Sequence, residues 1–115
     1  MTNNIYLETN SGLIEYLNSN YTSDTLFIID SNLTDINIDE KVNARVFYFD
    51  INEDTKNLTS VEKIWDLLFE QNLNRSSEIV IIGGGVLLDV CAFASCTFKR
   101  GISFSFVPST LLSMV

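Results

Sequence analysis

The apolar residues of this chain gather in short runs that polar segments separate. Several of these runs are rich in β-branched and aromatic residues and only a few residues long, which is typical of strands buried inside a sheet. They cover residues 25–30, 45–50, 79–82 and 103–107. A shorter, polar-flanked run at residues 4–8 predicts a brief first strand.

The segments between these runs carry apolar residues at helical spacing. Residues 59–72 predict a helix with a broad apolar face, and Thr59 with Glu62 forms a capping box at its start. Residues 86–99 contain no Gly or Pro and have the length of a helix of about three to four turns. Ser11 predicts the start of a short amphipathic helix, and residues 33–43 predict an irregular helix or turn.

Strands that alternate with helices predict a parallel, doubly wound sheet with right-handed crossovers. The expected fold is therefore α/β and Rossmann-like, with a mostly parallel sheet and helices on both faces. With 115 residues the chain has room for a single domain, spanning residues 1–115.

In such a fold the carboxyl ends of parallel strands lie on one rim, where open α/β sheets bind ligands. Several polar features follow directly after predicted strands. They are Asp30 and Asn32, the loop from Glu53 to Lys56, the glycines Gly83, Gly84 and Gly85, and the pair Ser109 and Thr110.

The glycines interrupt the apolar run I-V-I-I-G-G-G-V and precede a helix. A strand, glycine turn and helix in this order leave backbone N–H groups at a helix N-terminus with no Cβ to keep an anion away, which suits a phosphate or pyrophosphate. The run matches neither G-x-G-x-x-G nor a phosphate loop ending in Gly-Lys-Ser/Thr. A tight structural turn is the alternative interpretation.

Charge and composition exclude several classes of function. A net charge of −8 argues against nucleic acid as a partner, and no apolar run is long enough to span a membrane. No secretory signal is expected, which indicates a cytoplasmic protein. The chain has no histidine, so no catalytic or metal-binding residue is assigned, and Cys91 and Cys96 are expected to be reduced core residues.

Residues 83–115, G-G-G-V-L-L-D-V-C-A-F-A-S-C-T-F-K-R-G-I-S-F-S-F-V-P-S-T-L-L-S-M-V, resemble the glycine motif and following helix of the 3-dehydroquinate synthase family. The segment E-x-x-K-x-L-x-S-V-E-K-I-W at residues 53–65 is similar to the segment upstream of that motif. The resemblance implies an NAD-dependent sugar phosphate cyclase whose C-terminal metal-binding domain is not in this chain.

The resemblance also assigns roles to residues. It implies that Asp30 and Asn32 contact the nucleoside part of NAD and that Glu53 and Lys56 lie beside the adenosine ribose. Gly83, Gly84 and Gly85 match the pyrophosphate turn of the family, and Asp89 matches the carboxylate that follows this turn at the cofactor site. Ser109 and Thr110 match a Thr-Thr pair that contacts the cofactor. Arg100 matches an arginine that reaches the substrate phosphate across a dimer interface, as a guanidinium fork suits.

The implied reaction converts 3-deoxy-arabino-heptulosonate 7-phosphate into 3-dehydroquinate with release of phosphate, in the shikimate pathway to aromatic amino acids. The resemblance implies NAD as a reused cofactor, a divalent metal such as zinc or cobalt in the full-length lyase, and a homodimer. This chain alone is expected to be inactive. The alternatives are a related sugar phosphate cyclase, a metal-dependent alcohol dehydrogenase domain, and a non-catalytic binding relative.

The chain departs from the family pattern at Leu88 and Ala92, where glycines are usual. Leu88 needs compensating space, so NAD binding is expected to be weak. Individual features also have plain structural alternatives: Asp30 with Asn32 as an Asx turn, Glu53 with Lys56 as a solvated pair, and Ser109 as a helix cap. Finally, the C-terminal residues are expected to be exposed and to drive self-association; they are Phe104, Phe106, Leu111, Leu112, Met114 and Val115.

Overall fold

The computed structural model describes residues 2–4, 24–33, 46–99 and 101–108. The helix predicted after Ser11 and most of the segment 33–43 lie outside these residues, as do Arg100, Ser109 and Thr110.

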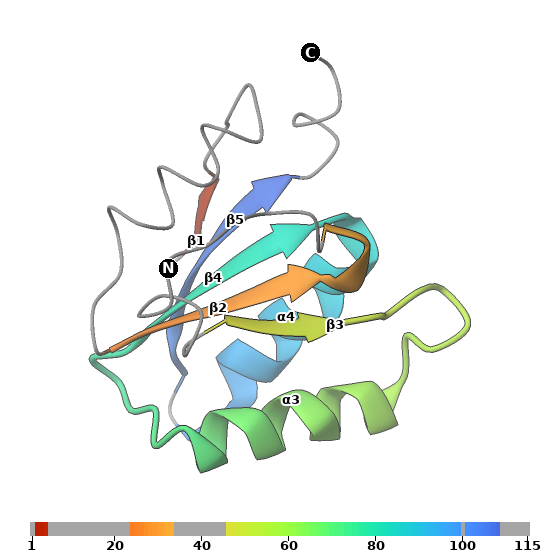
Figure 1. Cartoon of the computed structure of the whole chain (residues 1–115). Coiled ribbons are helices and arrows are strands. Elements are labelled where there is room, and N and C mark those ends of the chain that lie inside the picture. The colour runs from red at the N-terminus through yellow and green to blue at the C-terminus, as the bar shows by residue number, and fades with distance from the viewer. Residues whose placement is uncertain (1, 5–23, 34–45, 100, 109–115) are drawn as a thin grey trace.

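The described strands form one sheet in which every neighbouring pair is parallel (Figure 1). The strands are β1 (Thr2–Asn4), β2 (Thr25–Asp30), β3 (Val46–Phe49), β4 (Glu78–Gly83) and β5 (Ser103–Pro108). Their order across the sheet is β1-β5-β4-β2-β3. The predicted parallel α/β sheet is confirmed. The described first strand is Thr2–Asn4, and of the segment 4–8 predicted as a strand, residues 5–8 lie outside the described part of the chain.

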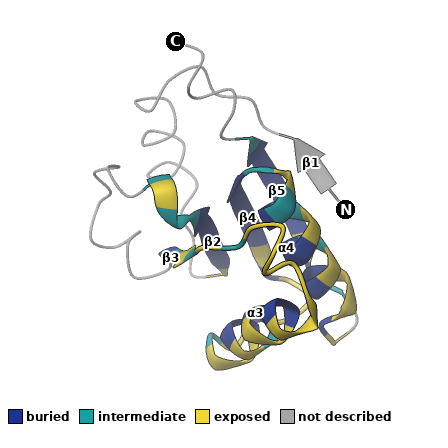
Figure 2. Cartoon of the chain, turned by 90° about the vertical axis from the view of Figure 1, so that its right-hand side faces the viewer, coloured by how far each residue is buried: buried dark blue, intermediate teal, exposed yellow. Residues whose placement is uncertain are grey.

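The central strands are buried on both faces, as their near-continuous apolar sequences predict. Leu26, Ile28, Ile79 and Ile81 point to the face that packs against helices α3 (Leu58–Glu70) and α4 (Gly85–Thr97). The alternate residues of the same strands point to the other face and are also fully buried; they are Phe27, Ile29, Val80 and Ile82. Figure 2 shows this continuous burial, and both described long helices lie on the first face.

Helix α3 is capped by Asn57, so the predicted capping box of Thr59 and Glu62 is wrong. Asn57 has extended backbone angles, φ −149° and ψ 179°, and its side chain accepts a hydrogen bond from the Ser60 N–H at 3.1 Å. Because the helix already begins at Leu58, Thr59 lies inside its first turn and cannot act as the cap.

Helix α4 packs against α3 through Trp65, whose indole N–H donates to the Ala94 carbonyl at 3.2 Å and to the Thr97 hydroxyl at 3.0 Å. Cys91 on α4 is buried as predicted, whereas Cys96 is exposed, and both are free thiols. Five residues along a helix turn a side chain by about 140°, so the two cysteines cannot both face the sheet.

The prediction that Phe104 and Phe106 are exposed is wrong. They are 7% and 9% exposed and belong to the core cluster beneath α4. The strand order places β5 between β4 and β1, and the face of β5 that carries both rings packs against the core residues of α4. The other residues of the predicted apolar edge, 111–115, lie outside the described part of the chain.

No helix in the part of the chain that the structure describes is long and apolar enough to cross a lipid bilayer.

Candidate functional site

The topology creates a switch point between β2 and β4. The chain continues from β2 to β3 on one side, and from β4 through α4 to β5 on the other. In open α/β sheets the two connections diverge at such a point and leave a crevice outside the carboxyl ends of the strands, where ligands bind. Asp30 ends β2 and Gly83 ends β4, so two predicted site residues flank this crevice.

Gly83 is required by packing within the chain. A Cβ at this position would lie 2.8 Å from Cδ2 of Leu87 and 3.2 Å from Cβ of Asp30. The first distance is shorter than real Cβ contacts, so a larger residue would displace Leu87 or the end of β2. The structural explanation therefore accounts for Gly83.

Gly84 and Gly85 have no such explanation. Apart from the adjacent residues and the backbone of α4 itself, no atom of the described residues lies within 4 Å of a Cβ built at either position. Gly84 has φ −94° and ψ −177°, which any residue can adopt, and the only described glycine with positive φ is Gly101. Neither packing against the described residues nor backbone strain calls for glycine at these two positions, and the missing side chains leave room for a close approach from outside.

The N-terminus of α4 adds hydrogen-bond donors to this opening. The Leu88 N–H donates to the Gly84 carbonyl at 3.1 Å, and the N–H groups of Gly85, Val86 and Leu87 precede this first helical bond. Gly84 has no side chain to cap them. Free N–H groups and the helix dipole together favour an anion at this position.

Asp30 forms an Asx turn, as its plain structural alternative predicted. Its Oδ1 accepts a hydrogen bond from the Asn32 N–H at 2.9 Å within the short 3-10 helix Ser31–Leu33. This bond orients the carboxylate at the carboxyl end of β2 and beside Gly83. The structural and the ligand-binding interpretations of Asp30 are therefore compatible.

Lys56 and Asp89 meet although they are far apart in the sequence. Lys56 Nζ lies 2.7 Å from Asp89 Oδ2, and their side chains are 38% and 56% exposed. The hydrogen bond from Lys56 to Asp89, and then the charge of Asp89, raise the pKa of Lys56 above its ordinary value, with Glu53 a smaller contributor. In place of the solvated pair with Glu53 that was the structural alternative, Lys56 thus forms a contact between the β3–α3 loop and α4.

A shallow groove of about 240 Å³ lies beside this ion pair, between the start of α3 and α4. Its lining residues are Lys56, Asn57, Val61, Asp89, Val90 and Phe93. The predicted rim residues thus fall in two neighbouring places, since Asp30 and the glycines flank the switch point whereas Lys56 and Asp89 border the groove. Asp89 links the two places, being one helical turn beyond Gly85.

Asn57 caps α3 although it is not among the predicted residues, and an Asn directly before a helix is the signal that indicates such a cap. Leu88 and Ala92, the departures from the family pattern, are partly buried and pack against the core. Arg100, Ser109 and Thr110 lie outside the described residues. Within the described ranges, no group of three or more metal-binding side chains comes together.

The fold and the switch-point opening define an α/β domain of the Rossmann-like class. The sequence model of the 3-dehydroquinate synthase N-terminal domain matches residues 46–115. The chain therefore belongs to the 3-dehydroquinate synthase family.

Two relatives with the same family name are similar to this chain in sequence. The 3-dehydroquinate synthase of Pelagibacter ubique is 38% identical over 98% of this chain and 32% of its own length. That of Prochlorococcus marinus strain AS9601 is 44% identical over 67% of this chain and 21% of its own length. The chain thus spans about a third or less of the relatives it matches.

Two solved sugar phosphate cyclases share the fold. A 2-deoxy-scyllo-inosose synthase, in complex with carbaglucose-6-phosphate, NAD+ and Co2+, is 24% identical with a TM-score of 0.66, over 91% of this chain and 31% of that one. A 2-epi-5-epi-valiolone synthase from Streptomyces hygroscopicus, with NAD+ and Zn2+ bound, is 14% identical with a TM-score of 0.65. The match covers 100% of this chain and 45% of that one.

Proposed function

We propose that this chain is the NAD-binding part of a 3-dehydroquinate synthase. The observation that carries the proposal is the opening at Gly84 and Gly85, where packing against the described residues does not call for glycine and the N–H groups of the first turn of α4 are available. The family assignment supports it, and so does the presence of NAD+ in the two solved cyclases.

The residues at the switch point fit a dinucleotide. The N–H groups of Gly85, Val86 and Leu87 would hold the pyrophosphate, and the Asp30 carboxylate would accept hydrogen bonds from a ribose hydroxyl. NAD, when bound, supplies reversible hydride transfer to and from a substrate hydroxyl. The residues of this chain bind and orient the cofactor and leave the remaining chemistry to other parts of the enzyme.

We also propose that the full-length enzyme, of which this chain is a part, catalyses the complete 3-dehydroquinate synthase reaction. The substrate would be 3-deoxy-arabino-heptulosonate 7-phosphate, and the enzyme would be a cytoplasmic homodimer. Arg100 would reach the phosphate of the substrate across the dimer interface. Ser109 and Thr110 would contact the cofactor. A divalent metal, zinc or cobalt, would be bound by chain beyond these residues, because this sequence has no histidine. The chain alone should therefore give no turnover when this substrate, NAD and zinc are supplied together.

Isothermal calorimetry with NAD tests the proposal. The wild-type chain should bind NAD weakly, and Gly84→Val should abolish this binding because its side chain fills the opening while leaving the fold intact by circular dichroism. Ser103→Ala is a suitable control, since Ser103 is exposed at the amino end of β5, away from the opening. The proposal fails if the wild-type chain does not bind NAD, or if Gly84→Val binds it equally well.

A further inference from the structure

The loop between β3 and α3 is closed by a turn that Asn52 and Thr55 build. The Thr55 N–H donates to the Asn52 carbonyl at 3.0 Å, and the Asn52 N–H donates to the Thr55 hydroxyl at 2.9 Å. The Asn52 Oδ1 accepts from the N–H groups of Asp54 at 2.9 Å and Thr55 at 3.2 Å. These reciprocal bonds fix an exposed loop that its polar sequence would otherwise leave free to move.

Lys56 follows this turn and is held from the other side as well. The Ser60 hydroxyl donates to the Thr55 carbonyl, and Ser60 is buried in the first turn of α3. Asn57, the next residue, is the N-cap of the same helix. The backbone is therefore anchored directly before and directly after Lys56.

This anchoring affects the strength of the ion pair. An exposed ion pair between long side chains contributes little to stability, because conformational entropy is lost when both partners are ordered. Here the Lys56 backbone is already fixed, and Asp89 stands on a regular helix. The only freedom left to lose is that of the two side chains. Their 2.7 Å contact joins the β3–α3 loop to α4 across 33 residues of sequence.

The contact also sets the charge beside the candidate pyrophosphate site. Asp89 lies one turn beyond Gly85, and an unpaired carboxylate there would repel an anion at the helix N-terminus. Lys56 neutralises this carboxylate, with Glu53 as the other charged group that acts on the lysine.

We infer that Asn52, Thr55 and Ser60 are positioning residues, which hold Lys56 on Asp89 and so shield the helix N-terminus of α4 from the Asp89 charge. None of the three needs to touch a ligand. The part of this inference that concerns NAD affinity rests on the proposed function, whereas the part that concerns Lys56 does not.

Matched variants at Thr55 test the positioning directly. Thr55→Val removes the hydroxyl but keeps the shape of the side chain, and Thr55→Ser keeps the hydroxyl. The Lys56 pKa, measured by NMR titration of its side chain, should stay raised in wild type and Thr55→Ser and fall toward its ordinary value in Thr55→Val. Asn52→Ala is a second, independent variant, since it removes the Oδ1 acceptor of the turn without adding a charge near Lys56. An unchanged Lys56 pKa in Thr55→Val and Asn52→Ala, both folded by circular dichroism, would overturn the inference.

Calorimetry with NAD tests whether the positioning of Lys56 affects the affinity for the cofactor. Thr55→Val should weaken binding by about two- to fivefold, the range expected for one exposed ion pair, and Thr55→Ser should restore it. In the Asp89→Asn background the Thr55→Val effect should vanish, because no charge remains to be shielded. A persistent effect there would overturn the shielding role. If wild type does not bind NAD, the proposed function fails while the Lys56 titration still decides the positioning.

Discussion

Gly83 and Gly84 are adjacent in the sequence but are glycine for different reasons. Gly83→Ala should lower the free energy of unfolding by about 1–3 kcal/mol, because the new methyl group would overpack against Leu87 and Asp30. Gly84→Ala should change it by less than about 1 kcal/mol, the usual effect of substitution at an N-cap. Urea unfolding of both variants decides this, and equal losses would contradict the distinction.

The two cysteines should also differ in reactivity. Burial raises the pKa of the Cys91 thiol, whereas Cys96 is exposed on the other side of α4. A thiol reagent at pH 8 should therefore modify Cys96 quickly in the folded protein and Cys91 only when the protein unfolds. Mass spectrometry after timed labelling measures this, with Cys96→Ser as the control that should leave no fast-reacting thiol. Rapid modification of Cys91 in that variant would contradict the burial.

At the scale of the elements, the start of α3 depends on one side chain. Asn57→Ala should destabilise the protein by about 1 kcal/mol, because it leaves the Ser60 N–H without its side-chain acceptor. Thr59→Ala, one position inside the helix, should change stability by no more than about 0.5 kcal/mol since Thr59 is exposed. Thermal unfolding compares the two, and a larger loss for Thr59→Ala would support the capping box after all.

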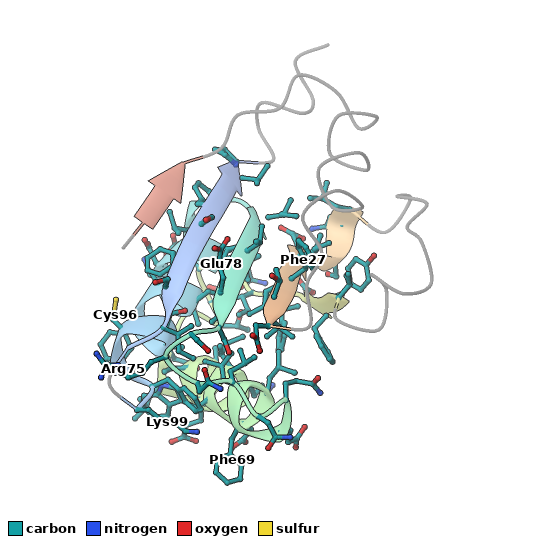
Figure 3. The ribbon with its side chains drawn as sticks, turned by 90° about the vertical axis from the view of Figure 1, so that its left-hand side faces the viewer. Phe27, Phe69, Arg75, Glu78, Cys96 and Lys99 are labelled. Atoms are coloured by element: carbon teal, nitrogen blue, oxygen red, sulfur yellow. The ribbon has the colours of Figure 1, made fainter. Side chains whose placement is uncertain are left out.

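The groove between α3 and α4 follows from how these helices pack. Trp65 bonds to Ala94 and Thr97 farther along α4, and Val61 and Val90 form the buried floor nearer the ion pair. Phe69 projects from the opposite end of α3, away from the candidate site (Figure 3). The polar end of the groove therefore lies at the carboxyl rim of the sheet.

At the scale of the whole molecule, β5 belongs to the core. Phe106→Ala should lower the free energy of unfolding by about 3–5 kcal/mol, because Phe106 is buried beneath α4. Light scattering should show the same oligomeric state for this variant and wild type, since the ring is not available to a partner. Dissociation of an oligomer without loss of stability would mean that Phe106 lies in an interface.

The sequence by itself determined the elements and their class. The strand predicted at residues 25–30 has the observed bounds. The broad apolar face predicted for residues 59–72 is the buried face of α3, with Val61, Ile64, Leu67 and Leu68 buried and Trp65 partly buried. These predictions succeed because periodicity and turn chemistry are properties of neighbouring residues. The alternation of strands and helices then implied a parallel sheet and placed Asp30 and the glycines on one rim.

Only the tertiary structure decided the contacts between distant segments. It placed β5 inside the sheet, paired Lys56 with Asp89, and showed that Gly83 is required by Leu87 and Asp30 while Gly84 is not. Lys56 and Asp89 are brought together by the packing of α3 on α4, and no local pattern contains that packing. Side-chain partners depend on how whole elements stack, which the sequence specifies only through the complete fold.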